Sequence, residues 1–161
     1  AAFLNKKISD SLFTDNPKAR IVIMGDFNDN PTNSSFKKIL NTKKRKNKTA
    51  VNEFYNPYER LYKKGLGTLA YRDKIHLFDQ ILISGSLLSN NKNFENLGFF
   101  QSHIFNPHYL TLSSGRYKGY PFRSFANGTF TNGYSDHYPV YINLIKMLKL
   151  WLLSEKNLTF D

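Results

Sequence analysis

Polar side chains follow a short apolar run near the start of the chain. The run covers residues 20–24 and is stopped by Gly25, after which come Asp26 and Asn28. If the extended backbone continues, Asp26 and Asn28 lie on the same side, because successive side chains of a strand alternate between faces. Asp26 can then hold a metal ion or a water molecule, and the Asn28 amide can donate a hydrogen bond to a phosphate oxygen. The alternative is a turn rich in Asx residues that caps the following helix.

A second acid, Asp79, lies within the apolar segment at residues 76–84. A carboxylate there must be paired or hydrogen-bonded, because burying it alone would cost several kcal/mol. One interpretation is a structural acid that accepts hydrogen bonds from backbone amides. The other is a functional acid that faces a partner from elsewhere in the chain.

A third acid, Asp136, directly precedes His137 at the entry to the last apolar segment. Adjacent strand residues point to opposite faces, so we do not expect Asp136 to orient His137. Asp79 is then the candidate partner of His137. An acid behind an imidazole fixes its tautomer and stabilises its charged form. The alternative is that Asp136 and His137 form a simple turn pair.

Helices and strands must position these residues, and the chain predicts both kinds of element in a single domain. Apolar periodicity and breaker residues predict helices at residues 1–15 and 31–40, the latter capped by Thr32 or Asn33. We expect strands at residues 20–24 (buried on both faces), 66–71, 76–84, 98–105 and 138–145, with a turn at 72–74. Residues 51–64 are helical or irregular, residues 90–96 and 113–134 are loops, and the tail from residue 146 is a weak amphipathic helix or an extension.

Composition limits the classes of protein to which the chain can belong. Its 161 residues are 40% hydrophobic and 16% aromatic, which is enough for one globular core. The absence of Cys excludes a disulfide scaffold, a thiolate zinc site and a cysteine nucleophile. No apolar run reaches the ~20 residues of a transmembrane helix, and no signal peptide is visible. The sequence leaves the compartment and the oligomeric state open.

The chain is strongly basic, with 23 Lys and Arg against 12 acids and a formal net charge of +11. Such a surface attracts phosphate polyanions or anionic membranes. The densest group of cations comprises Lys43, Lys44, Arg45, Lys46 and Lys48, in a stretch that we expect to be a loop. This loop either contacts phosphate or is simply solvated, since the bias toward Lys, Asn, Ile, Phe and Tyr can arise from the base composition of the coding DNA.

Three motifs occur together in a fixed order: Gly-Asp-Phe-Asn at residues 25–28, Asp-Gln-Ile-Leu-Ile-Ser at 79–84 and Ser-Asp-His-Tyr-Pro-Val at 135–140. The combination resembles the endonuclease/exonuclease/phosphatase superfamily, whose fold is that of pancreatic deoxyribonuclease. The likeness extends to about Leu144. Gly-Tyr-Pro-Phe-Arg at residues 119–123 and Gly-Tyr at 133–134 also resemble a bacterial branch of the superfamily.

The resemblance implies an α/β (α+β) protein built as a four-layer sandwich, and a Mg²⁺-dependent hydrolase of phosphate esters in which Mn²⁺ can substitute. Asp26 would orient or deprotonate the attacking water, and Asn28 would hold that water or a phosphate oxygen. Asp136 would bind the metal. His137 would contact the scissile phosphate, oriented by Asp79.

The family pattern also contains an early Asn, a metal-binding Glu and a second His before the first helix, and these have no counterpart here. We therefore expect residues 1–145 to be the C-terminal portion of such a domain, about half of the sandwich, followed by a tail at 146–161. The function expected is that of a phosphodiesterase or nuclease, with a phosphate-ester substrate that is nucleic acid, inositol phosphate or phospholipid. The alternatives are a non-catalytic basic module that binds nucleic acid, and an inactive, truncated family member.

Overall fold

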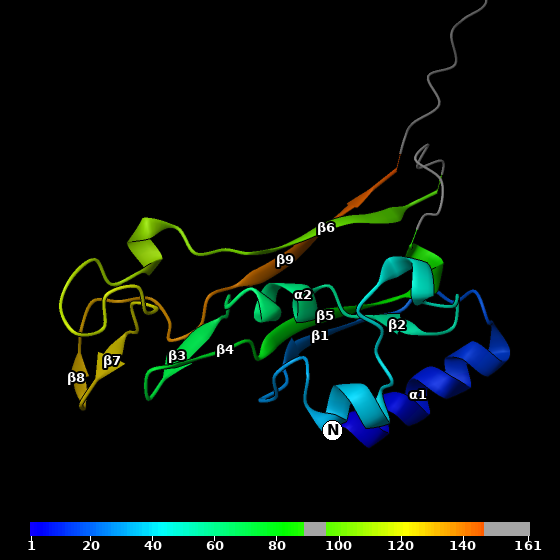
Figure 1. Cartoon of the computed structure of the whole chain (residues 1–161), viewed down its shortest axis with the longest axis horizontal. Helices are drawn as coiled ribbons and strands as arrows, with labels where there is room; N and C mark the ends of the chain where they lie inside the picture. Colours follow the sequence, from blue (N-terminus) through cyan, green and yellow to red (C-terminus); the bar gives the residue numbers. More distant parts are fainter. Residues whose placement is uncertain (89–95, 147–161) are drawn as a thin grey trace, which may run out of the picture.

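The computed structural model describes residues 1–88 and 96–146. The sequence-predicted loop at 90–96 and the tail after residue 146 therefore lie almost entirely outside the described residues. The part that is described has a mixed α+β architecture with small antiparallel sheets, arranged along one long axis (Figure 1). No described helix is long and apolar enough to cross a membrane.

The first helix, α1 (Ala2–Asp15), confirms the prediction at residues 1–15. It buries Ser9 and Phe13, and the Phe13 ring lies 5.6 Å from that of Phe54. The apolar stripe that helical spacing gives to Leu4, Ile8 and Leu12 is exposed. Helical spacing alone identifies a stripe, and here the neighbouring face packs on the sheet.

The main sheet has the strand order β1-β5-β2 and is antiparallel throughout. Its strands are β1 (Val22–Asp26), β5 (Asp79–Ser84) and β2 (Phe54–Tyr55). The prediction that residues 20–24 form a strand buried on both faces is wrong. Among the described residues β1 pairs with β5 alone, and Met24 is 71% exposed. The buried central strand is β5, in which the apolar run Ile81–Ile83 lies.

A tight hairpin precedes β5 and corrects the prediction of one strand at residues 76–84. It consists of β3 (Leu69–Tyr71) and β4 (Lys74–His76), joined by Arg72 and Asp73, whose φ angles of 48° and 59° suit a two-residue hairpin turn. The chain leaves β4 after His76 because the next backbone amide, that of Leu77, donates to the Asn30 side chain instead of to a strand.

A second, longer ribbon is formed by β6 (Gly98–Ile104) and β9 (Val140–Ile145), which confirms the strands predicted at 98–105 and 138–145. Its register shifts at a bulge between Phe99 and Gln101. The long loop predicted at 113–134 contains a small hairpin of β7 (Phe125–Ala126) and β8 (Thr129–Phe130).

Short helices complete the fold: α2 (Tyr58–Lys63), the π-helix η1 (Ser35–Ile39), and the 3-10 turns η2 (Lys46–Lys48), η3 (Gly85–Leu87) and η4 (His108–Leu110). The helix predicted at 31–40 is therefore reduced to η1. Its N-cap is Ser34, and no side chain, neither that of Thr32 nor that of Asn33, caps it. Residues 51–64, predicted as helical or irregular, contain β2 and α2.

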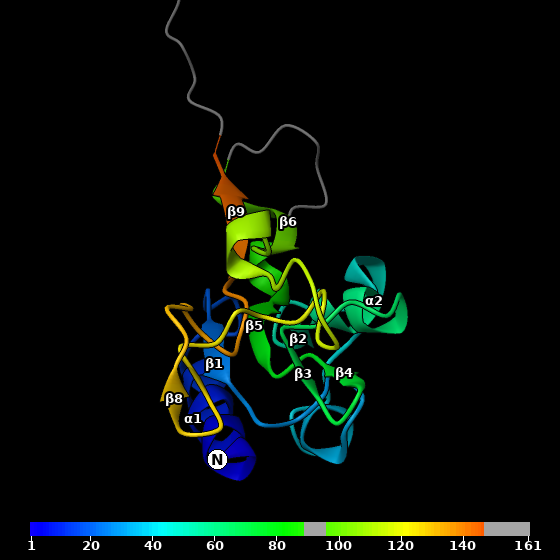
Figure 2. The same cartoon turned by 90° about the vertical axis from the view of Figure 1, so that its left-hand side faces the viewer.

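Figures 1 and 2 show α1 on one side of the main sheet and the β6–β9 ribbon on the other. The core follows these layers. One cluster joins α1 and η1 to the sheet through Phe13, Phe36, Phe54 and Leu82. Two others lie toward the ribbon, around Ile83 and Phe99 and around Tyr58 and Ile81. The ends of β1 and β5 are thereby held at a fixed position.

Candidate active site

Antiparallel pairing brings the end of β1 against the start of β5. In this register Asp26 is the partner of Asp79. His137 enters from the segment before β9, and its Nδ1 lies 2.7 Å from Oδ2 of Asp79. One ligand atom from each of Asp26, Asp79 and His137 lies within 4.8 Å of the others. The structure thus gathers three of the five residues that the sequence singles out.

Buried Thr68 is hydrogen-bonded to the backbone of both segments that carry the Asp79–His137 pair. Its Oγ1 accepts hydrogen bonds from the backbone amides of Phe78 (3.3 Å) and Asp79 (3.4 Å). Its carbonyl oxygen accepts one from the backbone amide of Tyr138, at 2.7 Å. The same residue is therefore bonded to the start of β5 and to the residue after His137. The side chains of Asp79 and His137 are 20% and 24% exposed, so the pair is sheltered but reachable.

Asp26 and Asn28 do not share an extended strand, so this expectation is wrong. The strand ends at Asp26, and the Asn28 backbone amide donates to Oδ1 of Asp26 at 2.8 Å. Asn28 has a φ of 51°, a left-handed conformation that Asn tolerates better than most residues. The alternative, an Asx turn, forms instead. Both side chains are exposed at the mouth of the site.

Asp136 is exposed and is not in this group of potential ligands within the described part of the chain. Its role as a metal ligand stays a prediction. The neighbouring residue Ser135 has a clearer structural part, because its hydroxyl accepts a hydrogen bond from the His137 backbone amide at 3.1 Å.

Sequence reasoning missed the polar residues that fix the loop after Asp26. Gln80 is fully buried; its amide nitrogen donates to the carbonyls of Asp29 (2.8 Å) and Leu77 (3.0 Å), and its oxygen accepts from the Asn56 amide (2.8 Å). The sequence signal was a Gln inside an apolar strand beside Asp79. Such a group needs partners when it is buried.

The donor set fits a hard divalent cation. It offers carboxylate oxygens from Asp26 and Asp79 and an imidazole nitrogen from His137. Carboxylate oxygens are the ligands that Mg²⁺ and Mn²⁺ prefer. Because Nδ1 of His137 is bonded to Asp79, its Nε2 is the nitrogen left for a ligand or a substrate.

A cavity of about 510 Å³ lies between the β3–β4 turn and the segment from 112 to 131. Guanidinium groups and aromatic rings share its lining, which includes Arg72, Arg116, Arg123, Tyr71, Tyr117, Tyr120 and Phe122.

The Tyr120 hydroxyl donates to Asp73 at 2.9 Å, a bond that raises the pKa of Tyr120. The Tyr138 hydroxyl lies 3.3 Å from the Gly119 carbonyl, which connects this segment to the residue after His137.

A mixed α+β fold with an acid–histidine pair and a second carboxylate at one sheet end is an arrangement suited to phosphoester hydrolysis. Residues 1–146 match the model of a family described as the endonuclease/exonuclease/phosphatase family, and the chain belongs to that family. The family is one of hydrolases of the phosphoesterase and nuclease type that generally use divalent metal ions. No curated protein and no solved structure matches the chain significantly.

Proposed function

We propose that the protein hydrolyses phosphodiester bonds by in-line attack of an activated water at the Asp26–Asp79–His137 site. The observation that carries the proposal is the 2.7 Å hydrogen bond between Asp79 and His137, with Asp26 close by. A non-catalytic binding module would have no use for this grouping. The proposal includes the four-layer sandwich, in which residues 1–145 are a C-terminal portion and residues 146–161 a tail.

Each residue has a defined part in the proposed reaction. Asp26 orients the attacking water or takes its proton, and Asn28 holds that water or a phosphate oxygen. Asp79 accepts from Nδ1 of His137 and so presents Nε2 to the scissile phosphate. A protonated His137 donates from Nε2 to a phosphate oxygen as negative charge develops in the transition state.

Among the residues present, the carboxylates of Asp26 and Asp79 would hold Mg²⁺ or Mn²⁺, with Asp136 added as a ligand, while His137 in its protonated form is not a ligand. When bound, such an ion neutralises charge on the phosphate oxygens. The exposed edge at Asp26 and Asn28 leaves room for a substrate.

The test is nicking of supercoiled plasmid, together with hydrolysis of bis-p-nitrophenyl phosphate, in Mg²⁺ and in Mn²⁺. We expect activity that disappears with EDTA and in His137→Ala. Activity that survives both treatments would contradict the proposed mechanism. If neither substrate is hydrolysed with either metal, the proposed activity of this chain is wrong.

A further inference from the structure

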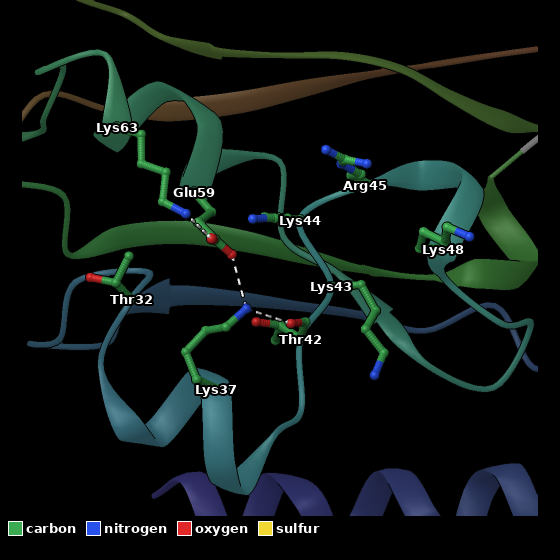
Figure 3. Close-up of a pocket in the computed structure, with 9 residues that line it drawn as sticks. All are labelled: Thr32, Lys37, Thr42, Lys43, Lys44, Arg45, Lys48, Glu59 and Lys63. Carbon is green, nitrogen blue, oxygen red and sulfur yellow. Dashed lines mark hydrogen bonds and ion pairs between the residues drawn. The ribbon is translucent and has the colours of Figure 1, made fainter.

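A strongly basic pocket of about 670 Å³ lies between η1, the loop at residues 42–48 and α2 (Figure 3). It is lined by Thr32, Lys37, Thr42, Lys43, Lys44, Arg45, Lys48, Glu59 and Lys63. Six of these nine side chains are cationic and one is acidic. We call this the basic pocket. Its lining contains none of Asp26, Asp79 and His137, and the proposed reaction does not use it.

A buried carboxylate forms the fixed base of the basic pocket. Glu59 is 2% exposed, and its oxygens accept from Lys63 at 2.7 Å and from Lys37 at 3.0 Å. Figure 3 shows the two lysines reaching Glu59 from opposite sides, one from α2 and one from η1. Lys37 also donates to the Thr42 carbonyl at 2.8 Å. Two ammonium groups are thus held in place while one negative charge offsets them.

Three further cations of the basic pocket are not compensated. Lys44, Arg45 and Lys48 are exposed, and within the described residues no ion pair involves their side chains. Their neighbours in sequence differ: Lys43 pairs with Glu53 at 3.1 Å, and the Lys46 ammonium lies 4.5 Å above the Phe99 ring. Clustered like charges repel one another, so their concentration here favours an anionic ligand.

The lining indicates which part of a ligand is recognised. It contains no aromatic or apolar side chain, so the basic pocket offers nothing for a base or a lipid tail to pack on. A second cavity of about 630 Å³ shares Lys44, Arg45, Glu59 and Lys63 with it and continues to Arg60 and Lys64. Two overlapping cavities lined by cations suit a ligand with several negative charges better than a single small anion.

We propose that the basic pocket binds the phosphate backbone of a nucleic-acid strand. The proposal rests on the proposed function and deepens it, because it names nucleic acid as the substrate class. Thr32 lines the basic pocket and belongs to the loop that follows Asp26 and Asn28. A strand bound through Lys44, Arg45 and Lys48 is thereby retained next to the segment that leads to the site.

The test is the binding of a fluorescein-labelled single-stranded oligonucleotide, measured by fluorescence anisotropy in EDTA so that no hydrolysis occurs. The pocket variant carries Lys44→Gln, Arg45→Gln and Lys48→Gln. The control variant loses the same charge at exposed lysines elsewhere, through Lys7→Gln, Lys18→Gln and Lys118→Gln. We expect the pocket variant to bind roughly tenfold more weakly or worse, and its log–log salt slope to be smaller by about 2, since each phosphate contact on a single strand contributes about 0.7.

Equal affinity of the pocket and control variants would overturn the proposal. So would a parent protein that ignores the oligonucleotide but binds phosphatidylserine vesicles through the same three residues. Hydrolysis of bis-p-nitrophenyl phosphate by the parent separates this proposal from the preceding one, because this small substrate tests the Asp26–Asp79–His137 site without the basic pocket. If the parent hydrolyses nothing yet binds the oligonucleotide through the pocket, the proposed activity fails and the binding site stands.

Discussion

At the scale of single residues, one hydrogen bond joins the two groups on which the proposed chemistry depends. Nδ1 of His137 and Oδ2 of Asp79 are 2.7 Å apart, and Thr68 anchors the backbone on both sides. An amide at position 79 would keep the size of the side chain but lose its charge. It could also select the wrong imidazole tautomer, because an amide can donate as well as accept.

Asp79→Asn is therefore expected to lower kcat by about 10²- to 10⁴-fold, with a smaller change in KM. His137→Ala should have a similar effect, and the double variant should be no worse than the poorer single one, because the pair acts as a unit. The measurement is steady-state hydrolysis of bis-p-nitrophenyl phosphate. Asp15→Asn, an exposed site at the end of α1, is the control. Additive losses in the double variant would argue that Asp79 and His137 act separately.

Buried Gln80 allows a second prediction at this scale. Gln80→Leu leaves the Asn56 amide and the carbonyls of Asp29 and Leu77 without their partner. Unsatisfied buried groups cost about 1–3 kcal/mol each, so we expect the free energy of unfolding to fall by at least about 2 kcal/mol. Urea denaturation measures this loss. Gln101→Leu, on an exposed position of β6, is the matched control, and an equal loss there would refute the assignment.

Strand alternation led to Asp79, and not Asp136, as the candidate partner of His137. Asp79 does lie beside His137, although Asp136 and His137 occupy a bend before β9 and not a strand. The extended backbone that would place Asp26 and Asn28 on one side does not form, because the strand stops at Asp26 and the alternative, an Asx turn, takes over. The contact of Glu59 with Lys37 could not be predicted, since it requires η1 and α2 to lie close together in the fold.

At the scale of elements, a close backbone approach positions the segment that carries His137. A side chain at Gly133 would collide with the backbone carbonyls of Phe122 and Arg123. The same Phe122 carbonyl accepts a hydrogen bond from the Tyr134 amide at 2.7 Å. The Gly-Tyr-Pro-Phe-Arg segment at 119–123 is therefore packed directly against the approach to His137.

Gly133→Ala should displace residues 133–137, lowering kcat by about 10-fold or more although it touches no catalytic atom. Gly115→Ala is the matched control: it lies in open space, and its φ of +76° costs only backbone strain of about 1 kcal/mol. Activity and urea denaturation are measured for both variants. Similar activity in the two variants would show that the approach at Gly133 does not position His137.

The contact between α2 and η1 gives the fold a dependence on pH. Burial raises the pKa of Glu59, but the hydrogen bonds and charges of Lys63 and Lys37 lower it by more than burial raises it. The pKa of Glu59 is therefore below its ordinary value. A carboxyl group whose pKa is lowered by folding stabilises the folded state at pH values above its ordinary pKa. This stabilisation is lost as the pH falls through the pKa of the group in the folded state.

Glu59→Gln should therefore lower the free energy of unfolding by about 1–3 kcal/mol near neutral pH. The difference from the parent should shrink as pH falls below about 4, the ordinary range for Glu. Thermal unfolding at a series of pH values measures it. Glu53→Gln, which breaks the more exposed pair with Lys43, should cost less than about 1 kcal/mol. A pH-independent effect of Glu59→Gln would contradict this account.

Helices and strands could be predicted from the sequence where a local pattern of residues determines them, and not where tertiary contacts determine them. α1, β6 and β9 have clear periodicity or apolar runs, and all three were found. The break between β4 and β5 was missed because the Asn30 side chain takes the amide of Leu77. The edge position of β1 was also missed, since an apolar run does not reveal how many partners a strand has.

At the scale of the whole molecule, a net charge of +11 opposes the compact state. Much of this repulsion is concentrated around the basic pocket, where Lys44, Arg45 and Lys48 adjoin the paired Lys37 and Lys63. A binding surface of this kind lowers stability in the absence of its ligand, as functional sites commonly do. The paired residues around Glu59 offset this repulsion but leave the three exposed cations without an ion pair among the described residues.

The pocket variant, with glutamine at positions 44, 45 and 48, should accordingly be more stable than the parent at low salt. We expect a gain of about 0.5–1 kcal/mol near 10 mM salt, where the screening length is about 30 Å, fading toward 150 mM, where it is about 8 Å. Thermal unfolding across this range measures it. The control variant with changes at Lys7, Lys18 and Lys118 removes the same charge from dispersed positions and should gain less. Equal gains would mean that net charge alone sets the stability, whereas a destabilised pocket variant would show that these cations hold the fold together.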